Sequence, residues 1–161
     1  MRQNQDDDLN VGAQIRLRHF DYRDSAPAYH VVICANRPHR PFTDPRLATA
    51  IISSLHWLRE HRAVQIYAYC LMPDHLHLLL RLTRPDWTLS QIIGAFKSYT
   101  TKVGRELGHG RYLWQRRFYD HILRQSEDAV GRGEYSRQNP VRAGLVEDAE
   151  AYPYSGYLDP M

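Results

Sequence analysis

The chain has 161 residues, of which 43% are hydrophobic and 11% aromatic, a composition typical of one globular domain with a core large enough to fold unaided. No apolar run reaches the length of a membrane span, and residues 1–10 lack the basic start and apolar middle of a secretory signal, so we expect a cytoplasmic protein with no membrane partner. Cys34 and Cys70 lie singly in apolar stretches, which predicts buried free thiols and no disulfide framework.

The formal net charge of +3 is unevenly distributed. Between Lys97 and Arg124, seven basic side chains oppose two acidic ones, which leaves +5, whereas residues 145–161 contain acidic residues and neither Lys nor Arg. Arginine supplies 19 of the 21 cations, and its planar guanidinium binds phosphate through paired hydrogen bonds and stacks on bases. The basic segment favours a polyanionic partner, although a GC-rich genome also produces arginine-rich proteins.

The hydrophobic pattern divides the chain into an extension and one domain. Residues 1–24 show no sustained periodicity, which predicts a flexible extension ahead of a single domain over residues 25–161. Asp44 before a proline, and Thr88 three residues before a glutamine, mark two helix starts. In chain order we predict a strand over Tyr29–Cys34, a helix over residues 45–61, strands over Gln65–Leu71 and His75–Leu80, a helix over residues 89–107, a strand over Phe118–Leu123, and a final helix that Ser126 caps and Asn139 ends.

This order of elements predicts an α+β fold of the ferredoxin-like type: a βαββαβ antiparallel sheet with helices on one face, followed by a C-terminal helix. The turn Met72-Pro73-Asp74 joins the second and third strands as a hairpin. In such a sheet the third strand is central. The second face of the sheet is then left partly free for the terminal helix.

The third strand carries two histidines at alternate positions. Successive strand residues point to opposite faces, so His75 and His77 project together from one face while Leu76, Leu78 and Leu80 fill the other. Two imidazoles held on one strand suit two ligands of a divalent cation. Alternating histidines are more often simply a solvated polar face, and a metal site needs a third group from elsewhere in the chain.

The link His109–Arg117 interleaves aromatic and basic side chains. This pattern suits stacking on unpaired bases while cations bind phosphates, but Tyr112 and Trp114 are nearly as well explained as core anchors of the link. The residues that we predict to bind DNA are Lys97, Arg105, Arg111, Trp114, Arg116 and Arg117.

The terminal helix offers a phenol and an amide. Tyr135 and Asn139 are four residues apart, so on a helix they lie on the same side and can approach one point together. Pro140 disfavours helical geometry at the residue before it, which predicts that the helix ends at Asn139. On the simpler interpretation, Asn139-Pro140 is only a helix stop and Tyr135 an ordinary half-buried aromatic residue.

Three segments together resemble the HUH-type single-tyrosine transposases, which are insertion-sequence-200-like, and most closely their REP-associated branch. They are residues 72–80 (MPDHLHLLL), residues 114–121 (WQRRFYDH), and Tyr135 with residues 139–146 (NPVRAGLV). The resemblance runs in order from about Tyr29 to Tyr157. Because three spaced motifs agree, it strongly favours the metal-site interpretation of the histidine pair.

The resemblance implies a ferredoxin-like catalytic domain that cuts single-stranded DNA beside a hairpin, such as a REP-like element or an insertion-sequence end. By the family's pattern, Tyr135 is the nucleophile, His75 and His77 bind Mg²⁺ or Mn²⁺, and Asn139 is the third ligand. The expected products are a 5′-phosphotyrosine link and a free 3′-hydroxyl. The resemblance allows either a monomer or a homodimer.

Some positions depart from the family's pattern. Asp74 stands where the family often has asparagine, and Ser136 replaces the usual apolar residue after the nucleophile. His121 is a fallback ligand. Two alternatives stay open: a non-catalytic protein that binds or regulates at DNA hairpins, and an RNA-binding sheet domain, for which only Tyr67 and Tyr69 could supply the exposed aromatic rings.

Overall fold

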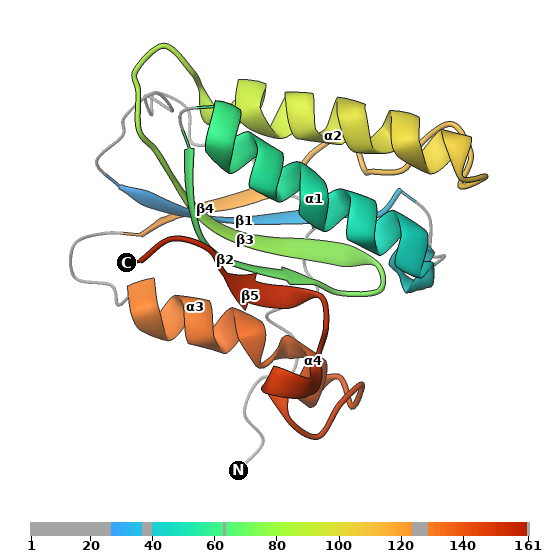
Figure 1. The fold of residues 1–161 in the computed structure, drawn as a ribbon. Helices are drawn as coiled ribbons and strands as arrows, with labels where there is room; N and C mark the ends of the chain where they lie inside the picture. Colours follow the sequence, from blue (N-terminus) through green and yellow to red (C-terminus); the bar gives the residue numbers. More distant parts are fainter. Residues whose placement is uncertain (1–26, 37–39, 63, 124–128, 161) are drawn as a thin grey trace.

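The computed structural model describes residues 27–36, 40–62, 64–123 and 129–160, so the predicted extension over residues 1–24 and the predicted Ser126 cap lie outside the described residues. Figure 1 shows an antiparallel sheet with α1 and α2 on one face and α3 on the other. The sheet has five strands in the order β4-β1-β3-β2-β5, so β3 is central, as predicted. The main elements are β1 (Ala28–Cys34), α1 (Pro45–His61), β2 (Val64–Leu71), β3 (His75–Leu82), α2 (Leu89–Glu106), β4 (Tyr119–Leu123), α3 (Ala129–Arg137), α4 (Asn139–Arg142) and β5 (Ser155–Tyr157).

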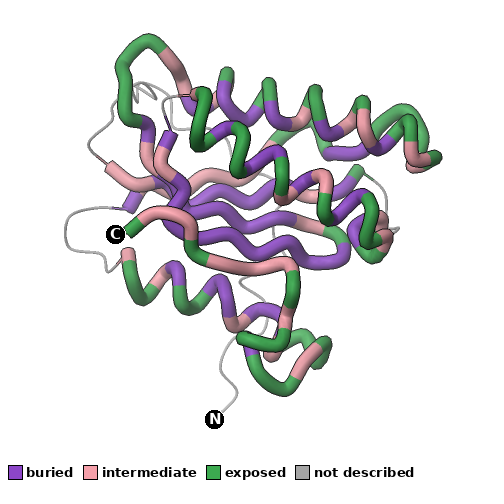
Figure 2. Tube along the Cα trace, viewed as in Figure 1, coloured by how far each residue is buried: buried purple, intermediate pink, exposed green. Residues whose placement is uncertain are grey.

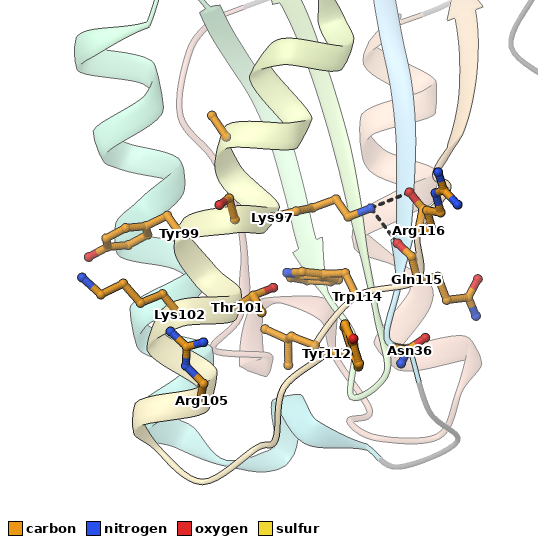
Figure 3. A pocket seen from close by; sticks show the side chains of 13 residues that line it. Asn36, Lys97, Tyr99, Thr101, Lys102, Arg105, Tyr112, Trp114, Gln115 and Arg116 are labelled. Carbon is orange, nitrogen blue, oxygen red and sulfur yellow. Dashed lines mark hydrogen bonds between the residues drawn. The ribbon is translucent and has the colours of Figure 1, made fainter.

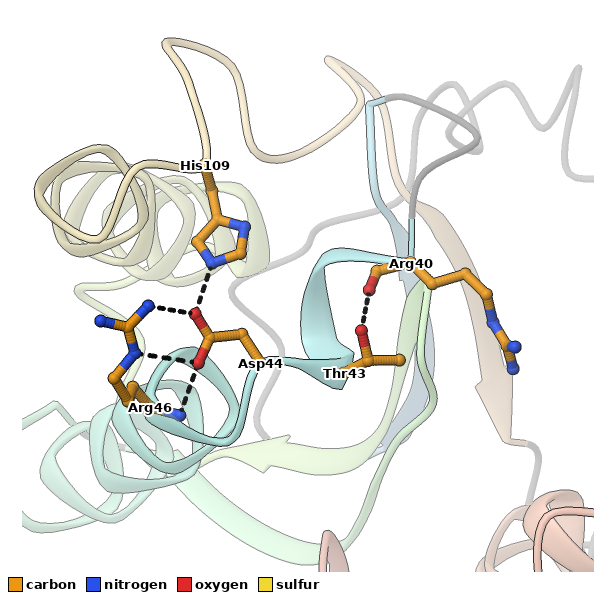
Figure 4. Close-up of polar contacts among 5 residues, drawn as sticks. All are labelled: Arg40, Thr43, Asp44, Arg46 and His109. Atoms are coloured by element: carbon orange, nitrogen blue, oxygen red, sulfur yellow. Dashed lines mark hydrogen bonds and ion pairs between the residues drawn. The ribbon is translucent and has the colours of Figure 1, made fainter.

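Both predicted helix starts are confirmed. The Asp44 side chain accepts a hydrogen bond from the backbone N–H of Arg46 at 3.0 Å, and the same carboxylate receives the Arg46 guanidinium at 2.8 Å. His109, in the loop after α2, reaches this carboxylate at 2.9 Å (Figure 4). Asp44 therefore caps α1 and also ties its start to the end of α2. At the start of α2, Thr88 and Gln91 form the predicted capping box.

The two faces of the sheet carry different clusters. Leu76, Leu78 and Leu80 of β3 pack under α1 and α2 in the main core, which Figure 2 shows as the buried layer between helices and sheet. Tyr67, Ala68 and Leu79 form a smaller cluster on the opposite face, where α3 lies. The alternation predicted for β3 is thus confirmed, and its histidines share the face that α3 covers.

Four details differ from the predictions. A fifth strand, β5, pairs with β2 at the sheet edge; three residues are too few to show a strand pattern in sequence. The terminal helix does not end at Asn139: α3 ends at Arg137, and Asn139 begins α4, with Pro140 in its first turn where proline costs no hydrogen bond.

Cys70 is buried as predicted, but Cys34 is only half-buried. Tyr67 and Tyr69 are each 8% exposed, so these rings are not available to stack on RNA.

No helix in the described part of the chain is long and apolar enough to cross a membrane.

Candidate functional site

The two histidines of β3 converge. The Nε2 atoms of His75 and His77 lie 3.0 Å apart. Two ligands at right angles, each about 2.1 Å from an octahedral ion, are about 3.0 Å from each other. The pair therefore has the spacing that two neighbouring ligands of one cation require.

The other ring nitrogens are also engaged. His75 Nδ1 lies 2.7 Å from Asp74 Oδ1, and His77 Nδ1 lies 3.2 Å from Nε2 of His30, whose ring stacks on it at 5.4 Å. With Nδ1–H of His75 donating to Asp74 and Nδ1–H of His77 donating to His30, both Nε2 lone pairs face the same point. Partners on the outer nitrogen fix the tautomer and orientation of a metal-binding histidine.

The electrostatics keep this cluster suited to binding a cation. Burial lowers the pKa of His77 well below its usual range, and the nearby charges of His75, His30 and Arg142 lower it further, so the ring stays neutral as a ligand must. Cys70, which pairs across the sheet with His77, has its pKa raised to about 12 by burial. Its thiol stays protonated and is a poor competitor for the cation.

The terminal segment places Tyr135 and Asn139 around one guanidinium. The Arg142 side chain donates a hydrogen bond to Asn139 Oδ1, and its guanidinium carbon lies 3.8 Å from the centre of the Tyr135 ring. The Arg142 charge also contributes to the lowered pKa of His77. Asn139 is buried and its Nδ2 has no hydrogen-bond partner among the described residues, whereas Tyr135 is 46% exposed. Tyr135 and Asn139 thus both contact the Arg142 side chain.

The described part of the chain offers no cluster of carboxylates, thiols and imidazoles as a complete ligand set. Among the described residues, no group of three or more His, Cys, Asp or Glu side chains is placed to hold a metal ion. The Asn139 amide oxygen, which accepts a hydrogen bond from Arg142, is a donor of suitable chemistry. Two imidazole nitrogens and an amide oxygen form a donor set that a divalent cation accepts. His121, the fallback candidate, lies on β4 opposite His30.

The helix that carries Tyr135 is held to the sheet by polar contacts with the C-terminal strand. Glu134 accepts a hydrogen bond from the Tyr157 hydroxyl at 2.7 Å, and the Arg137 guanidinium lies 4.6 Å from the centre of the Tyr157 ring. Arg137 also donates to Glu150 at 2.8 Å. These contacts fix α3 at the face that carries the histidines.

The predicted DNA-binding residues are found in two environments. Arg105, Arg111, Arg116 and Arg117 are exposed, as phosphate contacts require. Trp114 is only 5% exposed, and its indole N–H donates to Thr100 Oγ1 at 2.8 Å. The prediction that Trp114 stacks on bases is therefore wrong, and the alternative interpretation as a core anchor is correct. Lys97 also braces the link, because its Nζ donates to the Gln115 carbonyl at 2.6 Å and the Arg116 carbonyl at 3.0 Å.

Sequence reasoning did not single out His30 or Arg142, and it treated Asp74 as a neutral turn residue. A carboxylate directly before His75 was a usable signal for an outer partner of that imidazole. His30 gave no such signal, because only the register of β1 on β3 places it beside His77. Arg142 lies inside the third motif, but its contact with Asn139 depends on α4 continuing past Pro140.

Comparisons with known proteins support the family that the sequence motifs predict. Residues 25–132 match the family described as "Transposase IS200 like"; the match ends before Tyr135 and Asn139. A Haemophilus influenzae protein, provisionally named a REP-associated tyrosine transposase, is 33% identical over 108 residues, 61% of each chain. The REP-associated tyrosine transposase of Escherichia coli K12 is 26% identical over 103 residues, 62% of this chain and 58% of its own. The chain thus spans about three fifths of the length of these relatives.

Solved structures share the fold. The structure of a REP-associated tyrosine transposase bound to a REP hairpin superposes with a TM-score of 0.70 at 21% identity, over 89% of this chain and 81% of that one. A provisionally assigned transposase from Deinococcus radiodurans R1 gives a TM-score of 0.51 at 20% identity, over 78% and 97%. The architecture and the family match lead to the same conclusion: the chain belongs to the family of IS200-like transposases.

Proposed function

We propose that this protein cleaves and rejoins single-stranded DNA beside a hairpin, of the REP-like or insertion-sequence-end type, through a covalent link to Tyr135. The observation that carries the proposal is the convergence of the His75 and His77 Nε2 atoms at 3.0 Å on the face of the sheet that α3 covers. The hairpin partner is suggested by the relative whose solved structure holds a REP hairpin.

His75, His77 and Asn139 would hold Mg²⁺ or Mn²⁺. When bound, such a cation supplies positive charge that polarises a phosphate and orients it for in-line attack. The contacts with Asp74 and His30 orient the two imidazoles.

Tyr135 performs the covalent step. Its hydroxyl oxygen loses a proton and bonds to the phosphorus, while the bond from phosphorus to the 3′ oxygen breaks and that oxygen takes up a proton. The downstream strand is left joined to the tyrosine by its 5′ phosphate. One phosphodiester bond replaces another, so a 3′-hydroxyl can attack the phosphotyrosine and rejoin strands without ATP.

Arg142 is placed to meet the phosphate. Its guanidinium lies against the Tyr135 ring and bonds to Asn139, and the residue is exposed. Guanidinium groups bind phosphate oxygens through charge-assisted hydrogen bonds. We propose that Arg142 binds a non-bridging oxygen of the scissile phosphate, which would leave the Asn139 amide oxygen available as a ligand.

The test is a covalent-adduct assay. A 3′-labelled single strand with an imperfect hairpin, incubated with Mg²⁺ or Mn²⁺, is expected to give a labelled protein band on a denaturing gel. Tyr135→Phe should abolish the band, because the attacking oxygen is gone, and EDTA should abolish it in the wild type.

The matched control is Tyr99→Phe, which removes another exposed phenol and keeps its ring, on α2 at the other side of the sheet. It should leave the adduct unchanged. An undiminished adduct in Tyr135→Phe refutes the assigned nucleophile, and hairpin binding without any adduct in the wild type leaves only a DNA-binding protein.

A further inference from the structure

A groove lies between α2 and the link that precedes β4. Its volume is about 910 Å³. Figure 3 shows α2 forming one wall and the link forming the other, with Trp114 between them. The side chains that line it and carry the argument are Tyr99, Lys102 and Arg105 from α2, and Tyr112, Gln115 and Arg116 from the link.

The walls of the groove are fixed in place. Trp114 is buried between Phe42 and Phe96, with ring centres 4.7 Å and 5.8 Å away. Lys97 crosses from α2 and donates to two carbonyls of the link. A preformed surface of this kind loses little conformational entropy when it binds a ligand.

Two aromatic rings are presented to solvent here. Tyr99 is 57% exposed and Tyr112 is 59% exposed, among the largest exposures of any hydrophobic side chain described. The Arg111 guanidinium lies 5.4 Å from the centre of the Tyr112 ring. Exposed rings that flank a groove are platforms on which unpaired bases stack.

The charge of the groove is of one sign. Lys102, Arg105 and Arg116 are exposed, and none of the described residues that line the groove is acidic. Cations beside aromatic rings match a chain that alternates phosphates with bases. A base-paired stem keeps its bases stacked inside, so the rings favour an unpaired strand.

The link that forms one wall of the groove joins the sheet beside β1, the strand next to the one that carries the histidines. The backbone N–H of Gln115 donates to the Cys34 carbonyl at 2.8 Å, and Cys34 pairs with His75 on the other side of β1. Neighbouring strands are about 4.8 Å apart, so Gln115 and His75 are about 10 Å apart across the sheet. The groove lies on the α2 side of the sheet, whereas the histidines lie on the face that α3 covers, so a strand bound in the groove would pass around the link at the edge of the sheet to reach them.

We propose that this groove binds the unpaired DNA strand that adjoins the hairpin, with Tyr99 and Tyr112 stacking on bases and Lys102, Arg105 and Arg116 binding phosphates. The proposal rests on the proposed function, and it names the residues that would hold the single-stranded part of that substrate. It also replaces Trp114 with two tyrosines as the stacking residues.

The experiment measures the binding of fluorescein-labelled (dT)12 to the full chain by anisotropy across a salt series. Tyr99→Ala and Tyr112→Ala are each expected to weaken binding roughly five- to hundred-fold, and Tyr99→Phe and Tyr112→Phe to leave it unchanged, because stacking needs the ring and not the hydroxyl. Lys102→Ala should reduce the slope of log affinity against log salt concentration by about 0.7, because one phosphate contact is lost. Arg84→Ala also removes one positive charge, near the other end of α2, and should leave this slope unchanged.

Unchanged (dT)12 affinity in both alanine variants overturns the proposal, as does an equal loss in the phenylalanine variants. The adduct assay separates this result from failure of the proposed function. If the groove does not bind the strand, the wild type still forms the adduct while the alanine variants bind (dT)12 normally. If the protein does not form the proposed covalent link, the alanine variants still lose (dT)12 binding while the wild type forms no adduct.

Discussion

Trp114 and Tyr112 are two residues apart in the link but lie in opposite environments. Trp114 packs in the core and donates a hydrogen bond to Thr100, whereas the Tyr112 ring is exposed at the rim of the groove. Both are aromatic residues within two positions of an arginine, so their local sequence does not distinguish them. The difference arises because Ala35 forms a β-bridge with Trp114, which fixes the direction of its side chain.

We expect Trp114→Phe to lower the free energy of unfolding by about 1–3 kcal/mol, because it loses the bond to Thr100 and leaves a cavity. Urea denaturation measures this. Folded Trp114→Phe should bind (dT)12 with wild-type affinity. Tyr112→Ala should show the reverse pattern, with weakened binding and little change in stability; weakened DNA binding by folded Trp114→Phe would contradict its assignment to the core.

At the scale of secondary structure, α1 and the loop after α2 are joined through one carboxylate. The hydrogen bonds from Arg46 and His109 hold the pKa of Asp44 well below its usual range. A carboxyl group with a lowered folded-state pKa stabilises the fold above its unfolded pKa of about 4, and this contribution is lost as the pH falls through the folded value.

Asp44→Asn should therefore destabilise the protein at pH 7, and the difference from wild type should shrink as the pH falls below about 4. Asparagine is itself a good N-cap, so the change removes the charge and keeps the capping oxygen. Urea denaturation at pH 7 and pH 3 tests this. His109→Gln should reproduce part of the effect at pH 7. If the difference in the free energy of unfolding between wild type and Asp44→Asn is the same at both pH values, the charge of Asp44 contributes nothing to stability.

At the scale of the whole molecule, the last strand holds the proposed nucleophile's helix against the sheet. Residues more than twenty positions apart, Glu134 and Tyr157, meet through one hydrogen bond, and Arg137 lies over the same ring. The Tyr157 hydrogen bond is the main cause that lowers the pKa of Glu134. The proposed catalytic geometry thus depends on the edge strand β5.

Tyr157→Phe is expected to lower the free energy of local opening of α3 by about 0.5–1 kcal/mol, the usual range for an exposed polar contact. Hydrogen exchange of the α3 amides should become roughly two- to fivefold faster, with adduct formation slowed and exchange in β1 and β3 unchanged. Tyr112→Phe, which removes an exposed hydroxyl far from α3, is the control. Unchanged α3 exchange would show that the helix is held by its apolar contacts alone.

The sequence by itself determined the local structure and the candidate chemistry. The helix caps and the alternation of β3 depend on residues that are close together in the chain, so they could be predicted. The family was also predicted from three short motifs, and the match over residues 25–132 confirms it.

Only the tertiary structure decided which distant residues meet. Strand register places His30 against His77 and Cys70 opposite that ring, and the packing of the link buries Trp114 and exposes Tyr112. The continuation of the helix past Pro140 places Arg142 on Asn139. The physical reason is that such contacts join segments far apart in the chain, and their pairing is set by the burial of the whole sheet, which local patterns do not encode.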